Sequence, residues 1–336
     1  MKDYSSIILS SKIRLLRNLI GFEFPSMLAG DEGIKVLNKI ADTVLKVDDT
    51  FKLYKIKTLP ELDVNIMHEK KLITNKLMDA YGYGAVVLSE NEDVEIMINE
   101  SDHISEICKL TGLNLINAYD KINAIDNQIL SKLDIAFDDA IGFLTSNVAD
   151  VGTGLKASVT MFLPALSITG KVKEISQSLT SQGLELSMVS DDELSSEAYT
   201  YSLSNSQTIG KKETEYVVKV TEFALKLSDM EIRARTELMS YQKIDDVKDK
   251  VYRAWGILTN CYKISVAEAG EYLGELKMGI ALDLIRFKEV DFIDKLMVDI
   301  LPYSLTKISN SKVTDSDLDK YRATFLSNVL KSKRIK

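Results

Sequence analysis

The chain has 336 residues, of which 45% are hydrophobic and 27% are charged, values typical of a folded globular protein. Its formal net charge is −8, whereas proteins that bind nucleic acids usually carry a basic face that neutralises phosphates. These properties exclude a disordered or fibrous chain and argue against a general nucleic-acid binder.

The cysteines and the apolar runs indicate the cellular setting. Cys108 and Cys261 lie far apart and match no metal-binding or redox spacing, so we expect free thiols in a reducing compartment. The apolar run at residues 7–9 is too short for a signal sequence, and no segment approaches the roughly 20 apolar residues that a membrane span needs. We therefore expect a cytoplasmic protein with no membrane partner.

The first half of the chain mixes strand and helix signals. Residues 86–88 and 94–98 are β-rich runs joined by the polar cluster 90–93, a pattern that predicts an antiparallel hairpin. Apolar residues then recur at spacings of three and four from Ile116 to Leu133, which predicts a long helix. A second long helix is predicted from Glu213 to Met239.

A glycine-rich turn interrupts these elements at residues 150–159, which read D-V-G-T-G-L-K-A-S-V. We expect this turn to open a helix and to present backbone N–H groups to an anion. The segment is not a P-loop, because the G-x-x-x-x-G-K-[ST] pattern is absent. Taken alone, an ordinary tight turn is the simpler interpretation.

After about Tyr241 the strand signals stop and helical patterns follow. Ser265 and Glu268 form a capping box that predicts the start of a helix, and Leu318 and Phe325 belong to the apolar face of the last one. Strands and helices without regular βαβ alternation indicate an α+β fold, followed here by an all-α region.

Several stretches occur in the order found in guanido kinases. They are S-S-K-I-R-L-L-R-N at residues 10–18, N-E-S-D-H-I-S at 99–105, N-V-A-D-V-G-T-G-L-K-A-S-V at 147–159, and S-N-S-Q-T-I-G at 204–210. The segment V-Y-R-A-W-G-I-L at 251–258 resembles the C-terminal domain of bacterial protein-arginine kinases. The chain thus resembles that branch of the ATP:guanido phosphotransferase family over nearly its whole length.

The resemblance implies an architecture and a reaction. The expected fold is a guanido-kinase, glutamine-synthetase-like catalytic domain with an antiparallel sheet flanked by helices (residues 1–238) and a helical C-terminal domain (239–336). The family transfers the γ-phosphoryl group of Mg-ATP to a guanidino nitrogen. That chemistry requires a carboxylate that accepts a proton, and arginines with Mg²⁺ that hold the phosphates.

The carboxylates that the family uses are changed in this sequence. The second Glu of the family's N-E-E-D-H motif falls on Ser101, which cannot accept a proton at neutral pH. The preceding Glu100 is retained. The second substrate carboxylate falls on Asp192 if no gap intervenes. The candidate catalytic positions are therefore Ser101, Glu100 and Asp192.

The family's phosphate-binding arginines are also changed. Lys12 and Lys156 keep the charge but lose the bidentate fork of arginine, whereas Ser105 and Ser187 lose the charge. Arg14 is retained. The resemblance places the nucleotide against Ser10, Ser11, Lys12, Ile13, Arg14, Lys71, Ser105, Lys156, Ala157, Ser158, Val159, Thr160 and Ser187.

A further substitution concerns the charge near the phosphates. The family's Asn in C-P-T-N falls on Asp150, which would put a carboxylate near anionic groups. Each lost charge-stabilising donor lowers a rate by on the order of 10²–10³, and a lost general base by on the order of 10²–10⁴. Even with generous allowance for non-additivity, the sequence predicts little catalysis.

The helical domain carries a second family motif. Protein-arginine kinases bind phosphoarginine through R-D-x-x-R-A, which reads L-D-K-Y-R-A here, so Asp319 and Arg322 are retained and the leading Arg is Leu318. The resemblance implies weakened phosphoarginine binding by Asp319 and Arg322. Alternatively, these two residues form an ordinary solvated i,i+3 pair.

Three functions remain open on the sequence. The first is a pseudokinase that acts through protein contacts, as a homodimer or as the partner of an McsA-like adaptor, a stress-response repressor or a Clp chaperone. The second is an active protein-arginine kinase with a rearranged site, in which Glu100 is the base and Lys12 and Lys156 hold the phosphates. The third is a small-molecule guanidino kinase, which the helical region after Tyr241 disfavours.

Overall fold

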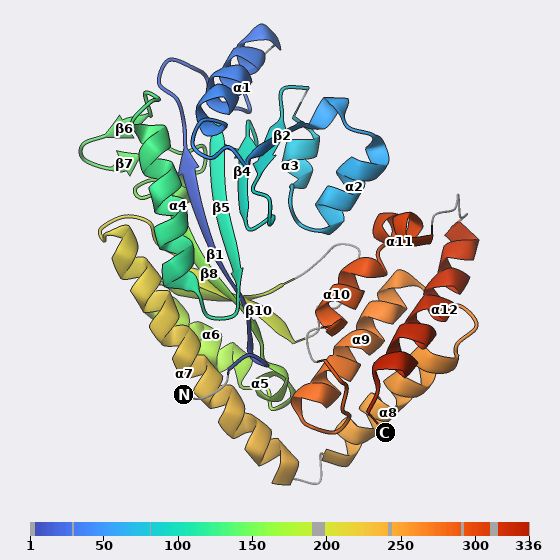
Figure 1. Ribbon diagram of the computed structural model, residues 1–336. Coiled ribbons are helices and arrows are strands. Elements are labelled where there is room, and N and C mark those ends of the chain that lie inside the picture. Colours follow the sequence, from blue (N-terminus) through green and yellow to red (C-terminus); the bar gives the residue numbers. More distant parts are fainter. Residues whose placement is uncertain are drawn as a thin grey trace.

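An eight-stranded antiparallel sheet forms the centre of the first 205 residues in the computed structural model, which describes residues 4–28, 30–80, 82–189, 199–240, 244–289, 292–309 and 315–335 (Figure 1). The strand order is β2-β3-β4-β5-β1-β8-β10-β9. The strands are β1 (Ile8–Arg17), β2 (Lys52–Lys55), β3 (Ala85–Leu88), β4 (Val94–Ile98), β5 (Ile104–Thr111), β8 (Leu155–Phe162), β9 (Leu184–Met188) and β10 (Thr200–Asn205). A separate two-stranded ribbon pairs β6 (Phe137–Asp138) with β7 (Gly142–Phe143).

The helices lie on both faces of the sheet. Figure 1 shows α4, α6 and α7 on one side and α2, α3 and the helical C-terminal part on the other. The helices that precede residue 241 are α1 (Gly30–Val44), α2 (Glu61–Glu69), α3 (Asn75–Met78), α4 (Leu115–Leu130), α5 (Pro164–Ile168), α6 (Val172–Ser181) and α7 (Glu213–Ser240). Short 3₁₀ helices span Ile56–Thr58 and Val148–Asp150.

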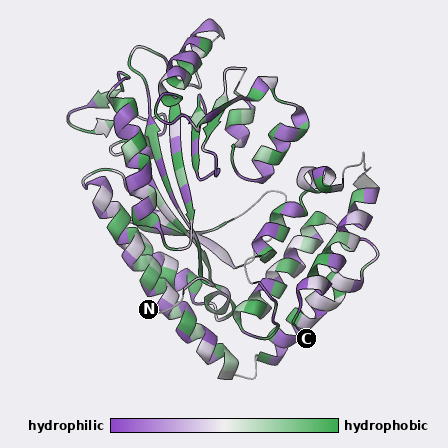
Figure 2. Ribbon diagram, in the orientation of Figure 1, coloured by the Kyte–Doolittle hydropathy of each residue, from purple (hydrophilic) through white to green (hydrophobic). Residues whose placement is uncertain are grey.

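The predicted hairpin and both predicted helices are confirmed. β3 and β4 pair antiparallel, and α4 and α7 cover the two expected segments. Hydrophobic and hydrophilic residues alternate in bands along α7, as its periodicity predicts (Figure 2). Every second residue of β1 and β8 contributes to the core under these helices, including Ile13, Leu15, Ala157 and Val159, all 0% exposed.

Helices joined by short loops make up the described C-terminal part, as predicted, and one isolated β-bridge pairs Phe287 with Arg334. Its helices are α8 (Ile244–Asn260), α9 (Val266–Ala281), α10 (Phe292–Asp299), α11 (Pro302–Ser309) and α12 (Asp315–Lys333). The Ser265 hydroxyl caps α9 by accepting a hydrogen bond from the Glu268 amide. The expected domain boundary near residue 239 falls at the C-terminal end of α7. No described helix is long and apolar enough to cross a membrane.

Hydrogen bonds at several places join the helical part to the rest of the chain. Glu69, the last residue of α2, is buried and accepts hydrogen bonds from the amides of Tyr303 and Ser304 (2.8 and 2.7 Å) at the start of α11. The Ser304 hydroxyl donates a third bond to it at 2.6 Å. On the other side of the molecule, Arg235 of α7 donates to the Ala281 carbonyl at the end of α9.

The expected helix after the glycine-rich turn is wrong, because the segment forms strand β8. Gly152 (φ +114°) and Gly154 (φ +64°) lie in the left-handed region, where L side chains are strained. A Cβ at Gly154 would lie 2.7 Å from the Leu16 carbonyl oxygen. The glycines therefore allow close strand packing, and this turn offers no helix N-terminus to an anion.

A buried ionic cluster lies between the sheet and its helices. The Arg17 side chain, 1% exposed, donates two hydrogen bonds to Asp126 of α4 at 3.1 and 2.7 Å and lies 3.4 Å from Glu213 of α7. Glu106 of β5 lies beside this cluster and is fully buried. Neither of its oxygens has a hydrogen-bond partner when the carboxyls of Glu106 and Asp126 are both ionised. Burial raises the pKa of Glu106 well above its usual value, and the nearby Asp126 raises it further.

We predict that Glu106→Gln stabilises the protein. A carboxyl whose folded pKa is raised costs stability as pH rises above its unfolded pKa, so the gain is absent near pH 4 and grows toward pH 8. We expect the free energy of unfolding at pH 8 to rise by about 1–3 kcal/mol. Urea unfolding at pH 4.5 and pH 8 measures it, with the exposed Glu90→Gln as the matched control. Equal stability of wild type and variant at both values would contradict the prediction.

A candidate ligand cleft on the sheet

A cleft of about 780 Å³ lies on the sheet face opposite α4 and α7. Strands β1, β5, β8 and β10 form its floor, the segment after α2 forms one rim, and α9 and α10 of the helical part form the facing wall. Its volume is that of a site for a small ligand.

Strand register brings most of the predicted nucleotide-binding residues to this face. Ser10, Lys12 and Arg14 alternate along β1 and pair with Thr160, Ser158 and Lys156 of β8. Ser105 of β5 and Ser187 of β9 lie on the same face. The cleft itself is lined by Ser10, Lys12, Lys71, Ser158 and Thr160 from the predicted set.

Four residues of the predicted nucleotide-binding set have their side chains on the opposite face of the sheet. Ser11, Ile13, Ala157 and Val159 are all fully buried against the helices. The Ser11 hydroxyl donates to the Gly112 carbonyl. Side chains alternate across a strand, so neighbours of cleft-facing residues must point into the core.

Three cationic residues stand at family arginine positions: Lys12, Arg14 and Lys156. Two of them form ion pairs with carboxylates. The Arg14 Nη2 lies 2.9 Å from Asp150, and the Lys156 Nζ lies 3.3 Å from Glu185. The sequence placed Asp150 near the phosphates, and the structure shows it neutralising the one arginine retained there.

Ser105 is only 2% exposed and lies within strand β5. Ser105 is therefore neither solvated nor part of a helix. Because its side chain is buried and neutral, Ser105 does not replace the missing arginine at the cleft surface.

The residues at the family's proton-accepting position are held by local bonds. The Ser101 hydroxyl accepts a hydrogen bond from Lys76 at 3.1 Å. One oxygen of Glu100 accepts from the Thr74 hydroxyl (2.8 Å) and the other from the Ser101 amide (2.6 Å). Although burial opposes the shift, the bonds from Ser101 and Thr74 lower the pKa of Glu100. Asp192 lies outside the described residues.

Asp102 and His103 support the end of β1 rather than the cleft. Asp102 accepts hydrogen bonds from the Asn18 side chain and the Ser146 amide. The His103 Nδ1 accepts from the Leu19 amide, which leaves its Nε2–H to donate to a backbone carbonyl. Burial lowers the pKa of His103 to about 4, so the ring is neutral at physiological pH.

Arg322 of α12 is buried, not solvated. It is 2% exposed and donates to the carbonyl oxygens of Ile300 and Ile264 at 2.9 Å each, as well as to Asp319. The i,i+3 pair expected on the sequence exists, but its arginine joins α12 to the segments before α9 and α11. Asp319 remains half-buried at the surface.

Two cleft residues, Lys109 of β5 and Glu95 of β4, were not predicted from the sequence. Lys109 is exposed to the cleft, and Glu95 is 4% exposed within an otherwise apolar strand. A single charge in such a strand was the available signal. Burial raises the pKa of Glu95 to about 7, although Lys12 and Lys109 oppose the shift. Burial likewise lowers the pKa of Lys12, against the opposing effect of Glu95.

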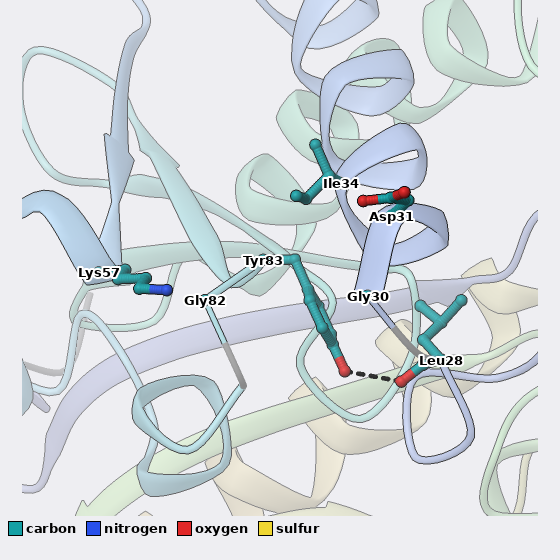
Figure 3. Close-up of a pocket in the computed structure, with 7 residues that line it drawn as sticks. All are labelled: Leu28, Gly30, Asp31, Ile34, Lys57, Gly82 and Tyr83. Carbon is teal, nitrogen blue, oxygen red and sulfur yellow. Dashed lines mark hydrogen bonds between the residues drawn. The ribbon is translucent and has the colours of Figure 1, made fainter.

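A second pocket, of about 450 Å³, lies at the start of α1 away from the motif residues. Figure 3 shows Tyr83 between Lys57 and Gly30, with its hydroxyl donating to the Leu28 carbonyl at 2.7 Å. Its two charged lining residues, Lys57 and Asp31, are exposed. The sheet cleft is therefore the stronger candidate site.

Comparison with known proteins identifies the fold. The model of the ATP:guanido phosphotransferase C-terminal catalytic domain matches residues 34–234. The duplicated taurocyamine kinase of Schistosoma mansoni superposes with a TM-score of 0.65 at 21% identity, over 74% of this chain and 38% of that one. A lombricine kinase superposes with a TM-score of 0.61 at 23% identity, over 69% of this chain and 67% of that one. The fold and the family match define a guanido-kinase catalytic domain.

Full-length relatives narrow the assignment. The protein-arginine kinase C-terminal domain model matches residues 244–336. A protein-arginine kinase of Clostridium tetani is 32% identical over 98% of this chain and 97% of its own length, and one of Bacillus subtilis is 32% identical over 96% and 89%. The chain belongs to the protein-arginine kinases of the ATP:guanido phosphotransferase family.

We predict that Asp150→Asn strengthens nucleotide binding in the cleft. The change removes the carboxylate that pairs with Arg14, so the guanidinium becomes available to a phosphate. We expect the dissociation constant for ADP, measured by isothermal titration at low salt, to fall by about threefold to tenfold. Asp139→Asn, which makes the same charge change in the β6–β7 ribbon, is the control. Unchanged affinity in Asp150→Asn would show that Arg14 does not reach the ligand.

Proposed function

We propose that this chain is a protein-arginine kinase homologue in which catalysis is impaired or lost, and which acts as a pseudokinase or regulatory partner in protein quality control and stress response. The observation that carries the proposal is at the family's proton-accepting position. Ser101 stands there bonded to Lys76, and both oxygens of the adjacent Glu100 are engaged.

The family reaction is the transfer of the ATP γ-phosphoryl group to a protein arginine. A guanidinium stays protonated far above neutral pH, so the attacking nitrogen needs a carboxylate to accept its proton. Serine cannot supply that carboxylate. Glu100 has a lowered pKa and no free oxygen, which makes it a weak substitute for a base.

The described phosphate-binding positions do not fit Mg-ATP as the family would hold it. Phosphoryl transfer depends on preorganised cations around the γ-phosphate. Here Arg14 and Lys156 are paired with carboxylates, and Ser105 and Ser187 are neutral. In the family, Mg²⁺ bound with ATP neutralises charge on the phosphates together with the arginines. This chain has few unpaired cationic side chains at those positions to do the same.

The alternative is an active kinase with a rearranged site, in which Glu100 is the base and Lys12 and Lys156 hold the phosphates. Lys12 does face the cleft without an ion-pair partner among the described residues. The bonds on Glu100 and the Lys156–Glu185 pair weigh against it. We therefore keep the impaired kinase as the proposed function.

The partners and setting of the chain remain proposals that rest on the family. We propose a homodimer in the cytoplasm that contacts an McsA-like adaptor, a stress-response repressor or a Clp chaperone. The two free thiols are compatible with a reducing compartment.

We predict that the purified protein forms little or no phosphoarginine. It would be incubated with Mg-ATP and an unfolded, arginine-rich protein, and phosphoarginine would be measured by mass spectrometry under conditions that preserve the acid-labile bond. We expect a rate at least about 10⁴-fold below that of the Bacillus subtilis protein-arginine kinase, which serves as the positive control, because the base is absent and two of the family's arginines are replaced by neutral serines.

A comparable rate that Glu100→Gln abolishes would refute the proposal and favour the rearranged site. The glutamine side chain keeps an oxygen for the Ser101 amide, so the loss of activity would reflect the base and not a collapsed loop. Glu90→Gln on the exposed β3–β4 turn provides the matched control.

A further inference from the structure

The pocket at the start of α1 brings two side chains of opposite charge to one apolar surface. Leu28, Ile34 and the Tyr83 ring supply the apolar part of its lining, and Lys57 and Asp31 supply the charges. Within the described parts of the chain, neither the Lys57 ammonium group nor the Asp31 carboxylate forms a hydrogen bond or an ion pair. Both charges are therefore available to a ligand.

The two charged side chains reach the pocket from different elements. Lys57 belongs to the 3₁₀ helix after β2, and Asp31 belongs to the first turn of α1. Figure 3 shows them on opposite sides of the pocket, with Ile34 and the Tyr83 ring between them. Because the two charges do not pair with each other, a ligand that carries both signs can bridge them.

Hydrogen bonds hold the walls of the pocket in place. The Asn99 side chain, 1% exposed, donates to the carbonyls of Gly33 in α1 and of Tyr83, at 3.1 and 3.0 Å. The Ile56 amide of the 3₁₀ helix donates to the Gly84 carbonyl at 3.1 Å. The three segments that line the pocket are thus joined before any ligand arrives, and such preorganisation lowers the entropic cost of binding. Asn99 also begins the N-E-S-D-H stretch, so the pocket and the family's proton-accepting position share this anchor.

Two glycines leave the room that these side chains need. A Cβ at Gly33 would lie 2.5 Å from the Tyr83 ring, so glycine lets the ring pack against α1. Gly82 has a φ of +90°, and a Cβ there would lie 2.8 Å from Cδ of Lys57. The lysine stem therefore lies against the backbone at Gly82, beside the Tyr83 ring (Figure 3).

The charges and the size of the pocket disfavour several classes of ligand. A phosphate group would meet the Asp31 carboxylate, and a divalent cation would find one carboxylate beside the positive charge of Lys57. A wholly apolar molecule would leave both charges without a partner. The volume of about 450 Å³ lies toward the small end of the range for ligand sites. The pocket therefore fits a small ligand with one positive charge, one negative charge and an apolar group.

We propose that this pocket binds a free α-amino acid with an apolar side chain, such as leucine. The carboxylate of the ligand pairs with the Lys57 ammonium group, and its ammonium group pairs with the Asp31 carboxylate. Its side chain packs against Ile34 and the Tyr83 ring, where apolar burial adds to the affinity. None of the lining residues belongs to the predicted catalytic or nucleotide-binding set, so the site is separate from the sheet cleft.

The test measures binding of L-leucine by isothermal titration at about pH 6.5, where an α-amino group is protonated. We expect Lys57→Met and Asp31→Asn each to weaken binding by about threefold to tenfold, as loss of a partly solvated charged contact would. Lys35→Met and Asp42→Asn are the matched controls, because they make the same changes at exposed positions of α1 outside the pocket. They should change the affinity by less than about twofold.

Two analogues of the ligand test which charge each residue contacts. L-Leucinamide lacks the carboxylate, and isocaproate lacks the ammonium group. We expect Lys57→Met to weaken binding of L-leucine but not of L-leucinamide, and Asp31→Asn to weaken binding of L-leucine but not of isocaproate. This cycle separates a direct contact from damage to the fold, because a distorted pocket would lose all three ligands.

Three results would overturn the assignment. The first is the absence of saturable L-leucine binding up to about ten millimolar. The second is equal weakening of L-leucine and L-leucinamide by Lys57→Met, which would show that the lysine does not contact the carboxylate. The third is weakening by Lys35→Met as large as that by Lys57→Met, which would reduce the effect to the net charge of this surface.

Discussion

The buried guanidinium of Arg17 joins the central strand to the elements around it. It donates to Asp126 of α4 and to the carbonyl of Thr153 in the glycine-rich turn, and it lies beside Glu213 at the start of α7. The Phe143 ring covers it at 3.7 Å from the ring centroid. Removal of either charge from such a pair leaves the other buried and uncompensated, at a cost of roughly 3–5 kcal/mol. The position of β1, and so of the cleft floor, depends on this contact.

Charges in the scaffold and charges in the cleft are constrained differently. Arg17 and Arg322 are buried and bonded on several sides, so substitution would unfold or loosen the chain. Ser101 and Ser187 stand at surface or half-buried positions, where loss of a family charge leaves the fold intact. A sequence can therefore keep the family architecture while the groups that touch substrates change, and fold similarity alone does not establish activity.

Periodicity alone predicted the elements whose partners are local. The hairpin of β3 and β4 and the helices α4 and α7 follow from apolar spacing. The segment after Gly154 was mistaken for a helix, although Leu155, Ala157, Val159 and Met161 alternate with polar residues as a strand requires.

The cleft could be predicted only in part. The family motifs predicted Lys12 and Ser158 as binding residues, and strand register brings both to the cleft. The motifs could not show that Arg14 is paired with Asp150 or that Lys109 stands opposite Lys12. Those contacts depend on the register of strands that are far apart in the chain. Nor could the motifs show which side chains are buried: the fold encloses Ser11 and Ser105, although both carry hydroxyl groups.

The Glu69 carboxylate, at the end of α2, binds the start of α11 and so connects the helical part to the rest of the molecule. α2 ends at Glu69, and the next two residues, Lys70 and Lys71, form the rim of the cleft. A displacement of α11 would therefore act on this rim through the bonds to Glu69. The Glu69 side chain thus connects the start of α11 directly to the rim of the cleft.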